Sequence, residues 1–151
     1  MMRKILIPLL LIAAPAAAQV RVPLIGQLGR SPQPQQPVLT GIDAMRAEFA
    51  AQSGGTTVYF GADSSQLGPQ ARTVLAAQAT WLRRHPEIVV RIEGHGDAGD
   101  TRDHALGVGA RRAEEVRSYL VLLGVPAAQL TAMSWGKERP GAGRAVTILV
   151  R

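Results

Sequence analysis

The segment 89–113, with the sequence VVRIEGHGDAGDTRDHALGVGARRA, constrains the fold of this chain more than any other segment. Residues 88–93, which span the beginning of this segment, form a near-continuous apolar run, which predicts a strand buried on both sides. A short loop rich in glycine and aspartate follows this strand. The chain then enters a helix whose stripe of small and apolar residues recurs at four- and three-residue spacing: Gly109, Ala113, Val116, Leu120 and Leu123.

The rest of the chain supplies one more helix and three more strands. The helix is predicted to begin at Gly68-Pro69 and to end near His85, and the helix described above to begin between Asp103 and Gly107 and to end at Gly124. The further strands are predicted at 56–60, 130–135 and 145–151. The order β-α-β-α-β-β predicts an α+β (α/β) two-layer sandwich, with the helices on one face of a mixed sheet.

Four segments divide the chain. Residues 1–18 have a basic start, a short apolar run and a small-residue end, which predicts a signal peptide. Residues 19–40 hold four prolines and five glutamines without an acidic residue, which is typical of a linker. Residues 41–54 are compatible with a short helix, and residues 55–151 form the predicted domain. We therefore expect an exported protein without a transmembrane segment, because a span needs about 20 apolar residues.

Composition narrows the classes of attachment and partner. The sequence contains no cysteine, so we expect neither a disulfide nor a lipid anchor on an N-terminal cysteine. The formal net charge is +6, but the arginines are scattered and the aromatic residues do not interleave with them. A stacking platform for nucleic acid needs that interleaving, so we expect no nucleic-acid partner.

Four short motifs occur in order along the predicted domain. They are YFGAD at 59–63, IEGHGD at 92–97, GARRA at 109–113 and SWGKERP at 134–140. Together they resemble the OmpA-like domain family, which includes the OmpA C-terminal domain and the peptidoglycan-associated lipoprotein. The resemblance covers roughly residues 56–139. It implies a module that binds peptidoglycan non-covalently in the periplasm, in association with the cell wall or outer membrane and with envelope proteins as further partners.

The resemblance also implies a site for the diaminopimelate of the peptidoglycan stem. In the family, the acid corresponding to Asp97 and the arginine corresponding to Arg112 grip this residue, and the positions of Thr101 and Asp63 face it. The chemistry suits the ligand, because a carboxylate matches its ammonium group and a guanidinium can bind its carboxylate with two hydrogen bonds. The N-terminus of the following helix would add to carboxylate binding.

Helix geometry distinguishes the two adjacent arginines. At about 100° per residue, Arg112 falls at the rim of the apolar stripe and Arg111 points to water. The rim position would let Arg112 be held by packing and still reach a ligand. The alternative for Arg112 is a structural salt bridge to Glu115 or Glu93.

The motifs depart from the family pattern at several positions. Ala105 replaces the usual asparagine, Gly96 a commoner small or hydroxyl residue, and Asp100 a usual glycine. The segment 143–146 (GRAV) replaces the usual Asn-Arg-Arg-Val, and the loop before it is short. These changes support an alternative function, a degenerate OmpA-like scaffold or interaction module that no longer binds peptidoglycan.

Some histidine and aspartate residues raise the question of enzymatic chemistry. His95 and Asp97 are spaced like metal ligands, and His104 lies in the same loop. Metal hydrolases need three or more converging ligands, and the sequence shows no further histidine cluster, no cysteine nucleophile and no Gly-x-Ser-x-Gly motif. We therefore expect no catalysis, no metal and no cofactor.

Overall fold

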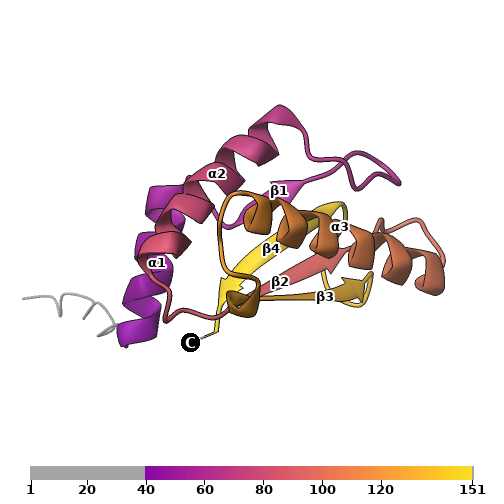
Figure 1. Cartoon of the computed structure of the whole chain (residues 1–151). Coiled ribbons are helices and arrows are strands. Elements are labelled where there is room, and N and C mark those ends of the chain that lie inside the picture. The colour runs from indigo at the N-terminus through magenta and orange to yellow at the C-terminus, as the bar shows by residue number, and fades with distance from the viewer. Residues whose placement is uncertain (1–39, 151) are drawn as a thin grey trace, which may run out of the picture. The chain divides into compact units, whose positions relative to one another are not determined.

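The computed structural model describes residues 40–150. Its elements in chain order are α1 (Gly41–Ser53), β1 (Thr57–Tyr59), α2 (Pro69–Arg84), β2 (Val90–His95), α3 (Arg102–Leu122), the short 3-10 helix η1 (Ala127–Gln129), β3 (Leu130–Gly136) and β4 (Arg144–Leu149). From β1 onward this is the predicted β-α-β-α-β-β order, with boundaries close to those expected (Figure 1). The predicted signal peptide and residues 19–39 of the predicted linker lie outside the described residues.

The four strands form one mixed sheet in the order β1-β4-β2-β3. β4 pairs antiparallel with both β1 and β2, and β2 pairs in parallel with β3. The parallel pair is joined through α3, since parallel neighbours need a long crossover connection. These features confirm the predicted fold class, an α+β sandwich with a mixed sheet.

Both long helices cover the same face of the sheet (Figure 1). Gly94 of β2, which pairs with Ala145 of β4, lies against Gly109 of α3. Thr147 lies two residues after Ala145 in β4 and therefore on the same face of the sheet. It donates a hydrogen bond to Gln78 of α2 at 3.0 Å. On β4, the residues of this face are buried and those of the opposite face only half-buried. The opposite face is thus the more open one.

α1 belongs to the packed core. Its Phe49 is fully buried and its ring centroid lies 5.1 Å from that of Trp81 in α2. Arg46 of α1 donates a hydrogen bond to the carbonyl of Leu149 at the end of β4. The short helix at 41–54 therefore packs on the domain, and the core extends N-terminal of Gly55, where we expected the module to begin.

A contact between two glycines brings α3 directly onto β2. A Cβ atom added to Gly94 would lie 1.9 Å from the carbonyl oxygen of Gly109, which is far inside van der Waals contact. Gly96 is equally constrained, because its Cβ would lie 2.3 Å from the Ala105 carbonyl oxygen. This close packing holds the end of β2 beside the first turns of α3, where the candidate site lies.

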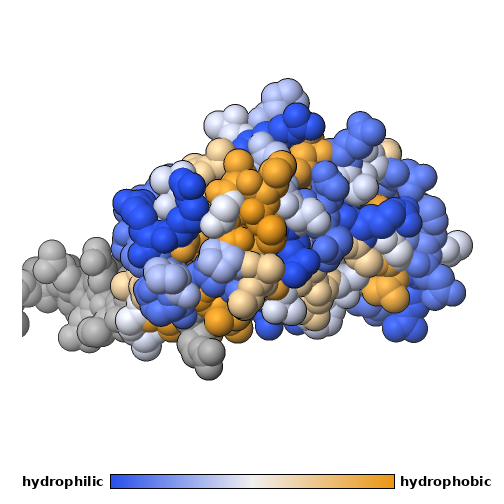
Figure 2. All heavy atoms as spheres, viewed as in Figure 1, coloured by the Kyte–Doolittle hydropathy of each residue, from blue (hydrophilic) through white to orange (hydrophobic). Residues whose placement is uncertain are grey.

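The surface is polar over much of the face drawn in Figure 2, which also shows an apolar patch near its centre. The large apolar side chains that the structure leaves exposed are Tyr59, Leu106, Val121, Leu122 and Val150. Within residues 40–150, no helix combines the length and apolar character needed to cross a membrane.

Candidate functional site

The loop between β2 and α3 carries the site and is shaped by a helix cap. Thr101 is the N-cap of α3, and its hydroxyl oxygen accepts a hydrogen bond from the backbone N–H of His104 at 3.3 Å. Threonine is one of the residues that favour this position, because its side chain satisfies an N–H group that has no partner inside the helix. The cap also explains why α3 begins at Arg102, one residue before the predicted range.

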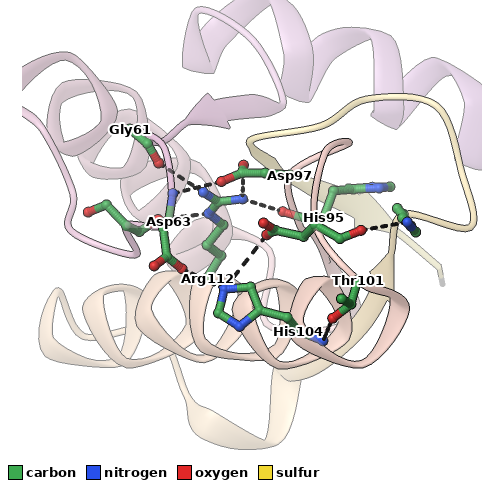
Figure 3. Close-up of polar contacts among 10 residues, drawn as sticks. Gly61, Asp63, His95, Asp97, Thr101, His104 and Arg112 are labelled. Atoms are coloured by element: carbon green, nitrogen blue, oxygen red, sulfur yellow. Dashed lines mark hydrogen bonds and ion pairs between the residues drawn. The ribbon is translucent and has the colours of Figure 1, made fainter.

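Arg112 lies at the centre of the site and is fully buried. Its Nε donates to the Ser64 carbonyl at 2.8 Å, and its Nη2 donates to the Gly61 carbonyl at 2.9 Å. Its Nη1 donates to the His95 carbonyl at 2.8 Å and to Oδ1 of Asp97 at 2.9 Å. One guanidinium group thus joins α3, the loop after β1 and the end of β2 (Figure 3).

The prediction that Arg112 lies at the rim of the helix was wrong. The helical wheel treated the sheet as the only neighbour of α3, but the loop at 61–68 also packs over the flank that carries Arg112. Its ionic partner is Asp97, and not Glu115 or Glu93. Arg111 is exposed, as expected.

Asp97 is held from two sides. In addition to the Arg112 contact, its Oδ2 accepts a hydrogen bond from the backbone N–H of Asp63 at 2.7 Å. The hydrogen bond from the Arg112 side chain, followed by that from Asp63, lowers the pKa of Asp97 below its ordinary value. Its side chain keeps 24% of its surface exposed, so the ionised carboxylate remains in contact with solvent.

Asp63 approaches the same loop from the end of β1. Its backbone has φ of +48°, a conformation that aspartate tolerates better than most residues. Its carboxylate is 65% exposed and lies 2.9 Å from Nε2 of His104, which is also 3.7 Å from Asp100. The structure therefore brings Asp63, Asp97 and Arg112 together, whereas the Thr101 hydroxyl is engaged in capping α3.

His104 is a member of the site that we had considered only as a metal ligand. The position of His104 three residues after the N-cap Thr101 is the feature that indicates this role, because a side chain there can reach back over the loop. His95 contacts Arg112 through its backbone carbonyl, and its side chain is buried elsewhere. Burial, followed by the charge of Arg144, lowers the pKa of the His95 side chain. Among the described residues, no three histidine, aspartate or glutamate side chains are grouped to hold a metal ion.

Comparisons with known proteins identify relatives of this domain. A family model described as the OmpA family matches residues 59–147. The chain is 45% identical over 99 residues to the peptidoglycan-associated lipoprotein of Pseudomonas aeruginosa, covering 66% of this chain and 58% of that protein. It is 43% identical over 86 residues to the protein of the same name from Mesorhizobium japonicum, covering 57% and 51% of the two chains.

Solved structures show a similar fold. The crystal structure of the peptidoglycan-associated lipoprotein from Burkholderia pseudomallei superposes with a TM-score of 0.62 at 35% identity, over 64% of this chain and 92% of that one. The C-terminal domain of Helicobacter pylori MotB matches with a TM-score of 0.58 over 63% of this chain and 84% of that one. At 19% identity, the second match shows likeness of fold alone.

These comparisons correct one prediction. We expected no lipid anchor because the sequence has no cysteine, but relatives at 41–45% identity are named lipoproteins, which contradicts that expectation. The chain spans about half the length of the curated relatives it matches. The cysteine count is therefore no ground for excluding an anchor. The relatives are named as lipoproteins and not as enzymes, in agreement with the prediction that the chain is not an enzyme.

Proposed function

The chain belongs to the OmpA family, and on this premise we propose that it binds peptidoglycan non-covalently through the diaminopimelate of the peptide stem, thereby anchoring or organising the cell envelope. The observation that supports the proposal is the convergence of two carboxylates, Asp63 and Asp97, with the buried guanidinium of Arg112 around one loop. Relatives named as peptidoglycan-associated add support for the ligand class.

The two carboxylates suit the ammonium group of diaminopimelate. Asp63 is largely exposed, and Asp97 is ionised and partly exposed beside it. The single guanidinium of Arg112 neutralises one of these charges, so the mouth of the site keeps an excess of negative charge. Charge-assisted hydrogen bonds from an ammonium group would be stronger there than those of a neutral amine.

The carboxylate of the ligand has fewer donors than the sequence suggested. Arg112 has five N–H groups, and four are used by protein acceptors within the described residues, which leaves one on Nη2. We propose that the first backbone N–H groups of α3 bind the ligand carboxylate, because the Arg112 side chain has no exposed surface through which to reach it. In this arrangement Arg112 mainly positions Asp97 and the two loops.

The proposed location is the periplasm, on the side of the cell wall or outer membrane. Residues 1–18 would direct export, residues 19–40 would serve as a linker, and the domain would meet the wall. Other envelope proteins are proposed as further partners. The proposed site needs neither a metal nor a cofactor, since its chemistry consists of ion pairs and hydrogen bonds.

A second candidate function is the scaffold or interaction module without wall binding. It is favoured by the full burial of Arg112, which spends four of its five N–H groups on the protein, and by Ala105, which is fully buried where the family has an asparagine. A methyl group at this position offers no hydrogen bond to the loop. Under this alternative, Asp97 and Arg112 would serve only to fasten the loops to α3.

Co-sedimentation with purified sacculi separates the two functions. The wild type should pellet with sacculi, and free diaminopimelate should compete. Asp63→Asn and Asp97→Asn should each weaken pelleting, because the neutral amide attracts an ammonium group less strongly. Glu115→Gln is the matched control, since it removes an exposed acid from α3 outside this cluster.

Folding of each variant is checked by circular dichroism. A wild-type protein that stays in the supernatant at micromolar concentration would exclude wall binding and leave the scaffold function. Pelleting that diaminopimelate does not compete would place the contact with the wall elsewhere on the domain.

A further inference from the structure

A cavity lies beside the loop that carries Asp97. It has a volume of about 330 Å³ and is lined by Gly96 and Ala98, the two neighbours of Asp97, and by residues 137–142 between β3 and β4. We call this space the basic cavity. A stem peptide bound at Asp97 would lie next to this cavity, because the two neighbours of Asp97 line it.

The charged groups around the basic cavity are mostly cationic. Lys137 and Arg139 line it, and Nη2 of Arg144 donates to the carbonyl of Pro140 in its wall at 2.8 Å. Lys137 is tied to the Asp100 carbonyl, which leaves two of its N–H groups for other acceptors. Glu138 also lines the cavity but is paired with Arg102 at 2.8 Å.

The Arg139 side chain is held from below by an ion pair that it shares with Arg91. Glu93 is buried between Arg91 at 2.9 Å and Arg139 at 3.4 Å, so one carboxylate faces two guanidinium groups. The Arg139 guanidinium lies over the Trp135 ring, with its carbon 3.5 Å from the ring centroid. This stacking fixes Arg139 in place and lowers the conformational cost of binding an acceptor with it.

Three buried nitrogen atoms in the same region have no hydrogen-bond partner among residues 40–150. They are Nδ1 of His95, Nε1 of Trp135 and Nε of Arg144. The strand register places all three residues on the open face of the sheet, under the segment that lines the cavity. Nε1 of Trp135 and Nε of Arg144 are obligate donors. A buried donor without an acceptor is unfavourable, and a negative charge nearby would reduce that cost.

We propose that the basic cavity binds a carboxylate of the same peptide stem that presents diaminopimelate at Asp97. The inference rests on the proposed function and extends it to a second contact. The chemical candidate is the free α-carboxylate of the γ-linked glutamyl residue that precedes diaminopimelate in the stem. Lys137 and Arg139 supply its direct donors, and the unpaired N–H groups of Trp135 and Arg144 add positive potential beneath them.

The test uses two synthetic tripeptides, alanyl-γ-glutamyl-diaminopimelate with the glutamyl α-carboxylate free and the same peptide with that group amidated. Binding of both to the full chain is measured by calorimetry. The wild type should bind the free acid about tenfold more tightly than the amide, the size expected for a charge-assisted hydrogen bond. Lys137→Ala and Arg139→Gln should lose this preference while binding the amide as the wild type does.

Arg111→Ala is the control, because it removes an exposed arginine outside the basic cavity and should keep the full preference. Equal wild-type affinity for the two peptides, or variants that weaken both peptides equally, would overturn the second contact and leave the diaminopimelate site intact. Failure of the wild type to bind either peptide would overturn the diaminopimelate site and this inference together.

Discussion

Oδ1 of Asp97 accepts a hydrogen bond from Nη1 of Arg112 at 2.9 Å, and the arginine side chain has no exposed surface. The two residues that were expected to face a ligand from opposite ends of a loop therefore face each other. The same guanidinium also donates to three backbone carbonyls, so its hydrogen bonds are made to the protein itself. A zwitterionic ligand would therefore meet the partly exposed Asp97 carboxylate and not the buried guanidinium.

Replacement of Arg112 should destabilise the folded domain, in addition to any effect on ligand binding. Arg112→Ala removes the guanidinium donor from three backbone carbonyls and from the Asp97 carboxylate, which keeps the Asp63 N–H. Breaking a buried pair in this way costs about 3–5 kcal/mol. Urea denaturation followed by circular dichroism measures the change in the free energy of unfolding. Arg111→Ala, one residue away and exposed, should change it by less than about 0.5 kcal/mol. Similar values for the two variants would contradict the role of Arg112 in joining the loops.

Acid should weaken the domain through Asp97. The Arg112 hydrogen bond lowers the pKa of Asp97 in the folded protein, whereas the unfolded chain has a value of about 3.9. The unfolded state therefore binds more protons between these two values. The contribution of Asp97 is complete above about pH 4 and is lost as the pH falls through the folded pKa. Urea midpoints measured from pH 6 to pH 2 should fall less steeply for Asp97→Asn, and an unchanged slope would refute this assignment.

The contact between β2 and α3 should tolerate no side chain at Gly94. Gly94→Val places a branched side chain against the Gly109 backbone, and we expect a loss of about 3 kcal/mol or more, the upper range for overpacking. Gly99→Ala is the matched control, because a Cβ at Gly99 would meet no atom within 4 Å. Thermal unfolding gives both values. A Gly94→Val protein as stable as the control would show that α3 can move away from the sheet at little cost.

Thr101 should act mainly on stability. Thr101→Ala removes the side-chain oxygen that caps α3, which should cost about 1 kcal/mol, while Thr101→Ser keeps the oxygen and should stay close to the wild type. Chemical denaturation measures this difference. Diaminopimelate affinity, measured on the folded proteins, should change little between the two variants. A large loss of affinity in Thr101→Ala with unchanged stability would instead place the hydroxyl in contact with the ligand.

The local sequence determined the elements and their ends. Pro69 at the start of α2 and Gly124 with φ of +90° after α3 lie where the residue types favour a helix start and a helix stop. The apolar run at 88–93 predicted a buried strand, and β2 lies inside the sheet between β4 and β3. These signals are readable because they depend on neighbours within a few residues along the chain.

The surroundings of the site residues were decided by the tertiary structure. The acceptors of Arg112 on Ser64 and Gly61 lie 48 and 51 residues away in sequence, so helix geometry alone gave the wrong exposure for this side chain. The positive surroundings of the basic cavity likewise join Arg139 from the loop after β3 to Glu93 of β2. The sequence determined which charged groups the domain carries, since that depends on composition and motif. Which charges meet depended on the packing of distant loops, because only burial and long-range pairing bring them within hydrogen-bond distance.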